Sequence, residues 1–452
     1  MVIIVLIIMT LLIALSKYTV SDKLSKVFIY LYLLWWFMWL FISALDVYGL
    51  FTVSAETYLI IFMSLFLFLI GFLFGKSQKN VAQSEVTKIN SINIRRNVLL
   101  NIILSFAFVI LAYYFIRYLS LSQTIPTAEL RMLRFSVGPL FSSTKLLLFF
   151  NFFIEAIIFF LYAIISYQII HRDMKNYTFV IALASLVMYA AIGSGRFPII
   201  YLLMALVLMF FIGRITVDEK ASDTVDDLKH LQARKTSILI LLLVMPQLMI
   251  YAAYLTAFRL GEYTFNFESI IIGMNELLRQ FIIYFTGSFR ALDYGLANLT
   301  SEVPLLFGQG TFAGVNEILH AVLHILGIEI QNTNYLIGEY LQNRSILIGV
   351  NIFHNYAYTS IMIFFFDFGI FGAILFSFLF GFFARKVIFT FNNKPTVPSL
   401  VLVVFIFQGM IFSVFNWVFQ SPAAVITISI CIIWQYFSKK EVADQVTAWI
   451  ED

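Results

Sequence analysis

Three kinds of side chain in this sequence are suited, by their chemistry and their positions, to bind an anion and to transfer protons. The first are arginines at the ends of apolar runs, such as Arg196 in the short turn Gly193-Ser-Gly-Arg-Phe-Pro198. The second is a histidine, His354, and the third are two carboxylates, Asp293 and Asp367. An arginine is always charged and grips phosphate oxygens with a planar fork, whereas histidine and aspartate can take and give protons. What these groups can do together depends on the elements that position them.

Composition places those elements in a membrane. The chain is 61% hydrophobic and only 12% charged, whereas soluble domains average about 25% charged residues. Apolar runs close to 20 residues recur along the chain, which is the length that spans a bilayer as a helix. We therefore expect an all-α polytopic membrane protein. The net charge of +4 requires no nucleic-acid partner, and the single Cys431 excludes a disulfide framework and a cysteine metal site.

Eleven apolar runs are predicted to be transmembrane helices. They divide the chain into eight helices with short loops within 1–255, a long loop over 256–353, three helices within 354–437 and a tail over 438–452. The predicted spans are 1–16, 27–44, 57–75, 98–116, 146–170, 178–195, 197–213, 237–255, a long one within 355–383, 397–416 and 421–437.

The basic residues indicate which side of the membrane each connection faces. Six alternate connections, 17–26, 76–97, 171–177, 214–236, 384–396 and 438–452, hold 20 of the 29 basic residues. Because basic loops stay in the cytoplasm, this pattern predicts an external N-terminus and a cytoplasmic C-terminus. The long loop over 256–353 is then external, and we expect it to fold against the membrane surface as several short helices.

The nine remaining basic residues comprise eight arginines and one lysine, whereas the cytoplasmic set comprises 6 arginines and 14 lysines. Because topology needs only positive charge, this external preference for arginine suggests anion binding. The alternative is that these arginines are scattered surface residues or partners of external acids. The candidates for binding a diphosphate are Arg131 and Arg134, spaced to share one helical face, together with Arg196, Arg290 and Arg344.

Two further features narrow the expected site. Glu155 lies inside a predicted span, four residues after Asn151, and must face the helix bundle or a wet cavity. As a single helix, 355–383 would be roughly 43 Å long, against a hydrocarbon core of about 30 Å. We therefore expect a break at Asp367-Phe-Gly and place His354 near the outer surface, as a proton acceptor or simply as an interface histidine.

Four stretches in this order resemble the O-antigen (oligosaccharide repeat-unit) polymerases and, more distantly, the O-antigen ligases. They are Gly193-Ser-Gly-Arg196, Gly287-Ser-Phe-Arg290 with Asp293, Gly308-Gln-Gly-Thr-Phe312, and His354-Asn355 followed by Asp367-Phe-Gly-Ile-Phe-Gly372. Each stretch is weak alone, and Gly308–Phe312 is a weak phosphate-loop candidate of a kind that is more often only a turn. The resemblance covers most of the chain.

The resemblance implies a membrane-embedded glycosyltransferase, independent of metals and cofactors, at the outer face of the bacterial cytoplasmic membrane. Its substrates would be oligosaccharides on undecaprenyl diphosphate, and its partners membrane lipids and a chain-length regulator. The arginine of the Ser-Arg motif and the histidine before an asparagine matter in the ligases, and Arg196 and His354 match those positions. Phe197-Pro198 after the arginine, and Asp367, favour a polymerase over a ligase.

Transfer of a sugar from a lipid diphosphate needs a base that takes the proton of the acceptor hydroxyl. His354 is the candidate base, with Asp293 or Asp367 as its orienter or its replacement. Asn355, Tyr294 and Tyr335 are candidate contacts of the glycan. The competing functions are an O-antigen ligase and a flippase or transporter of lipid-linked oligosaccharides. A carrier would be expected to have short loops and cations along its spans, rather than cations on one face beneath a long loop.

Overall fold

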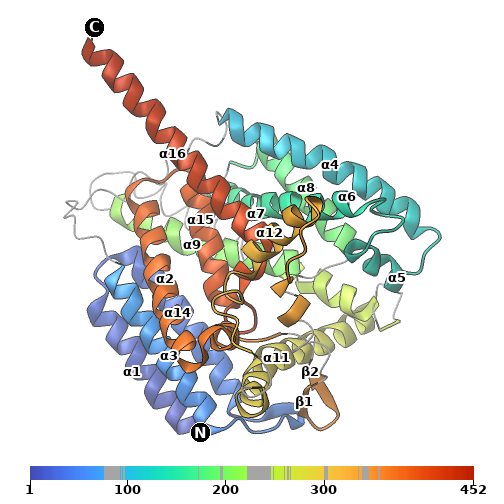
Figure 1. The fold of residues 1–452 in the computed structure, drawn as a ribbon, viewed down its shortest axis with the longest axis vertical. Helices are drawn as coiled ribbons and strands as arrows, with labels where there is room; N and C mark the ends of the chain where they lie inside the picture. Colours follow the sequence, from blue (N-terminus) through green and yellow to red (C-terminus); the bar gives the residue numbers. More distant parts are fainter. Residues whose placement is uncertain are drawn as a thin grey trace. The chain divides into compact units, whose positions relative to one another are not determined.

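A computed structural model of the chain describes residues 1–75, 92, 94, 97–171, 173–193, 197–220, 246–247, 249–258, 260–261, 264, 266–299, 304–333, 335–337, 346–354 and 357–451. It is mostly helical (Figure 1). Seven helices in this part of the chain are long and apolar enough to cross a membrane: α1 (Val2–Thr19), α2 (Lys23–Ser43), α3 (Ala55–Phe74), α4 (Val98–Ser122), the continuous helix Thr144–Ile170, residues Phe197–Ile215 of α9 (Phe197–Lys220) and α14 (Ser360–Asn393).

Four shorter apolar helices complete the set among the described residues: α8 (Tyr177–Gly193), Met249–Phe258, α15 (Val397–Phe412) and Pro422–Phe437 of α16 (Pro422–Glu451). The chain therefore has the build of a multi-pass, all-α membrane protein, as its composition predicts. Every predicted span overlaps one of these helices, although 237–248 of the span 237–255 is almost entirely outside the described residues. How many of the helices cross a membrane stays a prediction.

The chain folds into two compact units, each assembled from segments that are distant in sequence. Unit 1 comprises Met1–Ala82, Met249–Phe389 and Ile406–Pro422. Unit 2 comprises Gln83–Leu248, Thr390–Phe405 and Ala423–Asp452. The segment 256–353 belongs to unit 1 together with the first three helices and with Ile406–Pro422, so elements that are distant in sequence position its candidate site residues.

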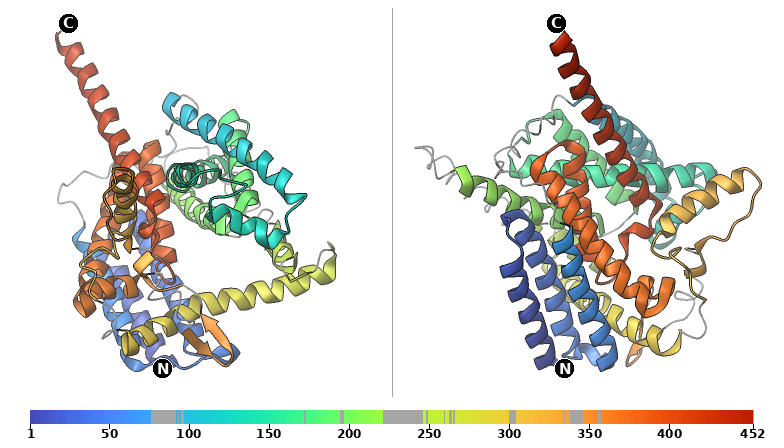
Figure 2. Two further views of the ribbon diagram at one scale, coloured as in Figure 1. Left: turned by 45° about the vertical axis from the view of Figure 1, so that its right-hand side comes forward. Right: turned by 60° about the vertical axis from the view of Figure 1, so that its left-hand side comes forward.

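Unit 1 is built on α1, α2 and α3, which lie side by side (blue in Figures 1 and 2). Local signals start two of these helices: Asp22 accepts a hydrogen bond from the Ser25 amide at the start of α2, and Ser54 accepts one from Thr57 at the start of α3. Glycine brings α3 against α14. A Cβ on Gly71 would stand 1.9 Å from the Phe378 carbonyl oxygen, so no larger residue fits there without moving the backbone.

The segment 256–353 contains more regular structure than several short helices. Its main element, α11 (Phe267–Asn298), has 32 residues and begins with a capping box between Asn266 and Ser269. A second helix, α12 (Ala313–Ile325), follows. The chain then forms an antiparallel hairpin of β1 (Ile346–Gly349) and β2 (Ile352–His354). The sequence analysis missed the length of α11 and the hairpin entirely.

The hairpin is extended by residues that follow α2. The Phe51 amide donates to the Ile348 carbonyl, and the Val350 amide donates to the Gly49 carbonyl, both at 2.9 Å. The two chain segments are therefore joined by a single antiparallel bridge between Leu50 and Gly349, although they are about 300 residues apart in sequence. These backbone hydrogen bonds attach the hairpin, which includes His354, to the connection between α2 and α3.

The predicted break at Asp367-Phe-Gly is confirmed. Within α14, Phe368 (φ −146°, ψ 26°) and Gly369 (φ 64°, ψ −148°) leave the helical conformation. The Gly369 angles lie in a region that is essentially restricted to glycine. The helix therefore changes direction directly after Asp367.

Unit 2 packs α4 against α8, and the helix α7 (Glu155–Ile170) against α8 and α9. A single π-helical turn, Phe150–Ile154, joins α7 to the short α6 (Thr144–Phe149) within one continuous helix. Such turns insert an extra residue and are frequent at functional sites. Here the turn ends at Glu155, the carboxylate that the sequence places inside a span.

Candidate functional site

Buried polar side chains in each unit include predicted site residues. In unit 1 they form three separate sets of contacts: Arg290 and Asp293 on α11 with residues around the α2–α3 connection, His354 on β2 with Ala357, and Asp367 on α14 with Gly310 and Thr311. In unit 2 a cluster surrounds Arg134, which lies in the single helical turn Leu133–Phe135 after α5 (Thr127–Met132).

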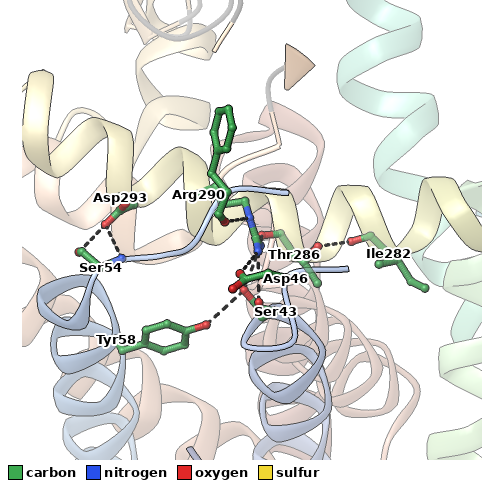
Figure 3. A network of polar contacts seen from close by, with 9 residues as sticks. Ser43, Asp46, Ser54, Tyr58, Ile282, Thr286, Arg290 and Asp293 are labelled. Carbon is green, nitrogen blue, oxygen red and sulfur yellow. Dashed lines mark hydrogen bonds and ion pairs between the residues drawn. The ribbon is translucent and has the colours of Figure 1, made fainter. Parts of the chain in front are cut away.

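Arg290 is the centre of the unit 1 network (Figure 3). The residue is 4% exposed, and each of its five N–H groups has an acceptor. Nε donates to the Phe51 carbonyl, Nη1 to Ser43 Oγ and the Thr286 carbonyl, and Nη2 to the Ser43 carbonyl and Asp46 Oδ1. A phosphate oxygen could reach this guanidinium only by displacing one of them. As it stands, Arg290 ties α11 to the α2–α3 connection.

Asp293 lies one helical turn further along α11 and bonds to the start of α3 (Figure 3). Its Oδ1 atom accepts hydrogen bonds from the Ser54 amide at 3.2 Å, from the Ser54 hydroxyl, and from Thr57 Oγ1 at 2.6 Å. Its Oδ2 atom accepts none of these bonds, and the residue is only partly buried. Of the two predicted carboxylates, Asp293 is therefore the one with an oxygen left to interact with a further group.

Asp367 is fully buried and uses both of its oxygens. Oδ1 accepts from the Gly310 amide at 2.8 Å, and Oδ2 accepts from the Thr311 amide at 2.7 Å and from the Thr311 hydroxyl. The turn that the sequence analysis treated as a weak phosphate-loop candidate thus binds an anion, but the anion is the chain's own carboxylate. Asp367 and the Gly308–Phe312 stretch are joined as one structural feature.

His354 is 4% exposed, so it is not on the surface of unit 1. Its Nε2 atom hydrogen-bonds the Ala357 carbonyl. Because a carbonyl only accepts, Nε2 carries the proton and Nδ1 carries the lone pair. Burial lowers the pKa of the imidazole to about 4, so the ring is neutral at pH 7. Nδ1 faces Gly287 of α11, where a Cβ would stand only 2.8 Å away.

The unit 2 cluster is an ion pair with aromatic walls. Arg134 Nη2 donates to Glu155 Oε1 at 2.6 Å and to the Tyr189 hydroxyl, which itself donates to Glu155 Oε1 at 3.1 Å. The guanidinium carbon lies 4.6 Å from the centre of the Tyr189 ring. Arg134 is 9% exposed, and its buried Nε has no hydrogen-bond partner among the residues that the structure describes. Unlike Arg290, this arginine has donor capacity that the protein leaves unused.

Arg134 also connects this cluster to the Gly193 motif. A Cβ on Gly193 would stand 2.1 Å from Arg134 Nη1, so glycine is needed there for the guanidinium to fit. Glu155, which the sequence placed in the bilayer as either a packing or a cavity residue, is the ion-pair partner of Arg134. Sequence reasoning missed Tyr189, and no local pattern marks it.

The remaining predicted residues are located as follows. Tyr294, on α11, is partly buried, and Tyr335 is 72% exposed. Only the backbone of Arg131 is described, within α5. Arg196, Arg344 and Asn355 lie outside the described residues. Among the described residues, no three histidine, cysteine, aspartate or glutamate side chains form a group that could hold a metal ion.

Comparisons with known proteins add no further identification: no family model, curated protein or solved structure matches the chain. The function is therefore inferred from the geometry of these polar contacts and from the motif resemblance.

Proposed function

We propose that the chain is a membrane-embedded glycosyltransferase that polymerises lipid-linked oligosaccharide repeat units, as the O-antigen polymerases do. It would act at the outer face of the bacterial cytoplasmic membrane, with its N-terminus outside and its C-terminus in the cytoplasm. The donor would be a growing glycan on undecaprenyl diphosphate, and the acceptor a repeat unit on the same lipid.

The observation that carries this proposal is the interlocking of the motif stretches in unit 1. Gly287 lies against His354, and Gly310 and Thr311 bind Asp367. These residues come from three of the four stretches that define the resemblance, and they lie up to about 80 residues apart. If these motif matches were due to chance, the matching stretches would not be expected to contact one another in the folded chain.

The reaction requires a base, cations and a leaving group. The acceptor hydroxyl oxygen forms a bond to the anomeric carbon of the donor sugar, and the bond from that carbon to the diphosphate oxygen breaks. The electron pair leaves with the lipid diphosphate, and the hydroxyl proton passes to the base. His354 is neutral at pH 7 and has its lone pair on Nδ1, so it can accept that proton once the Gly287 side of the ring opens. Asp293 Oδ2 is the alternative acceptor.

Within unit 2, the arginine best suited to bind a phosphate is Arg134. It is buried, its Nε has no partner in the described part of the chain, and it carries a charge that does not titrate near neutral pH. Arg196 belongs to the same motif as Gly193, which contacts Arg134, and we assign it the same role. Arg131 and Arg344 remain candidate helpers, and Arg290 would contribute only by exchanging one of its present partners.

The experiment is a reconstitution of the full chain in liposomes with lipid-linked repeat units as the only substrate. A ladder of longer lipid-linked glycans is expected. Arg134→Lys keeps the charge but removes the planar fork, and should lower the rate about 10²–10³-fold if the contact acts in the transition state. Arg279→Lys is the matched control, because Arg279 is an exposed arginine paired with Glu276.

Two outcomes would replace this proposal with a competing one. Product that forms only when lipid A–core is supplied would identify a ligase. Movement of the lipid-linked oligosaccharide across the bilayer without any new glycosidic bond would identify a carrier. A ladder that persists unchanged in both Arg134→Lys and His354→Gln would leave polymerisation in place but overturn the assigned residues.

A further inference from the structure

Helix α12 carries a row of exposed apolar side chains. Val315 is 39% exposed, Leu319 50%, Val322 50% and Leu326 68%. Their spacing of four, three and four residues places the first three on one face of the helix, and Leu326, which caps its C-terminus, follows them at the same spacing. In a protein surrounded by water such a row would be costly, so something apolar is expected to cover it.

The other face of α12 is polar but carries no cation. It presents Asn316, Glu317, His320 and His324, and the sequence Ala313–Ile325 contains no lysine or arginine. The two imidazole rings are parallel within 2°, with centres 6.0 Å apart. The helix is therefore amphipathic, and attraction to anionic groups would contribute little to whatever it binds.

The start of α12 is fixed to the kink of α14. Thr311, two residues before the helix, donates to Asp367 at that kink. The Phe312 and Phe376 rings lie edge to face with their centres 6.1 Å apart. The first turn of α12 therefore lies beside the bend, and the rest of the helix continues from that point (Figure 2, where α12 is gold).

The length of helix between the kink and Arg385 indicates the depth at which the kink would lie in a bilayer. Sixteen residues separate Gly369 from Arg385, which corresponds to roughly 24 Å of helix, close to the thickness of a hydrocarbon core of about 30 Å. Arg385, paired with Asp22, and Lys386 mark one boundary of this apolar stretch. The kink then lies at the opposite boundary. Ile370 and Phe371, just past it, are 51% and 64% exposed, so the apolar outer surface of α14 extends up to where α12 begins.

We propose that α12 is an interfacial helix that lies on the lipid bilayer, with Val315, Leu319, Val322 and Leu326 inserted at the boundary between headgroups and acyl chains. The occupant of the apolar row is lipid rather than a protein, because the row continues the lipid-facing surface of α14 and begins at interface depth. Insertion is driven by apolar burial and is insensitive to lipid charge. This inference does not depend on the glycosyltransferase chemistry.

The test measures the depth of individual side chains with nitroxide labels in the full chain. Cys431 is the single native cysteine and is buried, so a Cys431→Ser background leaves only introduced labelling sites. Leu319→Cys and Val322→Cys report on the apolar row, and Glu317→Cys and His324→Cys are matched controls on the polar face. The protein is placed in nanodiscs of phosphatidylcholine, and the collision rates with oxygen and with a water-soluble nickel chelate are compared.

Labels at 319 and 322 should collide at least several-fold more often with oxygen, relative to nickel, than labels at 317 and 324. Replacing a third of the phosphatidylcholine with phosphatidylglycerol should leave that ratio unchanged. Equal nickel accessibility on both faces would overturn the proposal, since the row would then face water. Protection of 319 and 322 from both reagents would also overturn it, because a protein surface would then cover the row.

Discussion

The imidazole of His354 and the backbone of Gly287 are in direct contact, with the place of a Gly287 Cβ only 2.8 Å from Nδ1 and 2.8 Å from Ile348 Cδ1. The contact joins β2 to α11 through two residues of different motif stretches. It also explains why a glycine occupies the middle of a helix, where alanine would normally be favoured by about 1 kcal/mol.

Gly287→Ala should therefore destabilise the protein although it raises helix propensity. Forcing a methyl group into this contact should cost about 1–3 kcal/mol, observed as a lower thermal unfolding temperature in detergent. Gly138→Ala is the control, because the nearest atom to its Cβ would be 3.9 Å away. A Gly287→Ala protein as stable as the parent would show that His354 is not held against α11.

Protonation of His354 should weaken the fold at acid pH. The pKa of about 4 in the folded state lies below the ordinary value of about 6.5. As the pH falls from about 6.5, the unfolded chain takes up a proton that the folded chain does not, so stability decreases until the pH reaches about 4. The slope from this one group approaches 1.4 kcal/mol per pH unit.

His354→Gln should remove that part of the pH dependence between pH 6.5 and 4.5 while the carboxylates continue to titrate. The measurement is the unfolding temperature of parent and variant across this range. Parallel curves would show that the histidine is already protonated in the folded protein, or is exposed.

Arg290 should be one of the most sensitive positions in unit 1. Arg290→Met keeps much of the side-chain volume but leaves Asp46 and the four other acceptors without their donor. The Arg290 side chain is buried but that of Asp46 is 34% exposed, so the acceptors left unpaired should cost about 1–3 kcal/mol, observed as a lower unfolding temperature.

Arg279→Met on the same helix is the matched control for Arg290→Met. Arg279 is 46% exposed in its side chain and pairs with Glu276 one turn away, so its loss should change stability by less than about 1 kcal/mol. Yields and unfolding temperatures of the two variants are compared. Equal effects would mean that the Arg290 network does not hold the α2–α3 connection.

Asp367 should stabilise the turn before α12 through both of its oxygens. Asp367→Asn replaces one acceptor with an amide that cannot accept from the Thr311 or Gly310 N–H. The expected loss is about 1.5–3 kcal/mol, typical of hydrogen bonds to a charged group.

Asp293→Asn is the comparison for Asp367→Asn, because all of the Asp293 hydrogen bonds described here go to Oδ1 and an asparagine oxygen can accept them. Asp293→Asn should therefore lower the stability less than Asp367→Asn does.

Combining Asp367→Asn with Thr311→Val gives a double-mutant cycle, in which the two losses of stability should not add. Strict additivity would contradict the contact between Asp367 and Thr311.

The sequence could predict those features of the fold that depend on residues close together in the chain. Apolar runs of known length located the helices, because hydrophobic burial needs only composition and order. Asp367-Phe-Gly predicted the break in α14, because Gly369 has backbone freedom that other residues lack. The same local reasoning could have found α11, whose apolar residues Phe267, Ile271, Met274 and Leu278 recur at helical spacing. Apolar residues on both sides of Val350-Asn351 could have suggested the hairpin.

Only the tertiary structure decided which charged side chains already have hydrogen-bond partners within the protein. Arg290 and Arg134 are equivalent in sequence terms, as arginines outside the basic connections. The fold gives Arg290 an acceptor for every N–H, whereas the described residues provide none for Arg134 Nε. Hydrogen bonds are directional and their partners here lie up to about 250 residues apart, so no local pattern could distinguish a structural arginine from one able to bind a substrate.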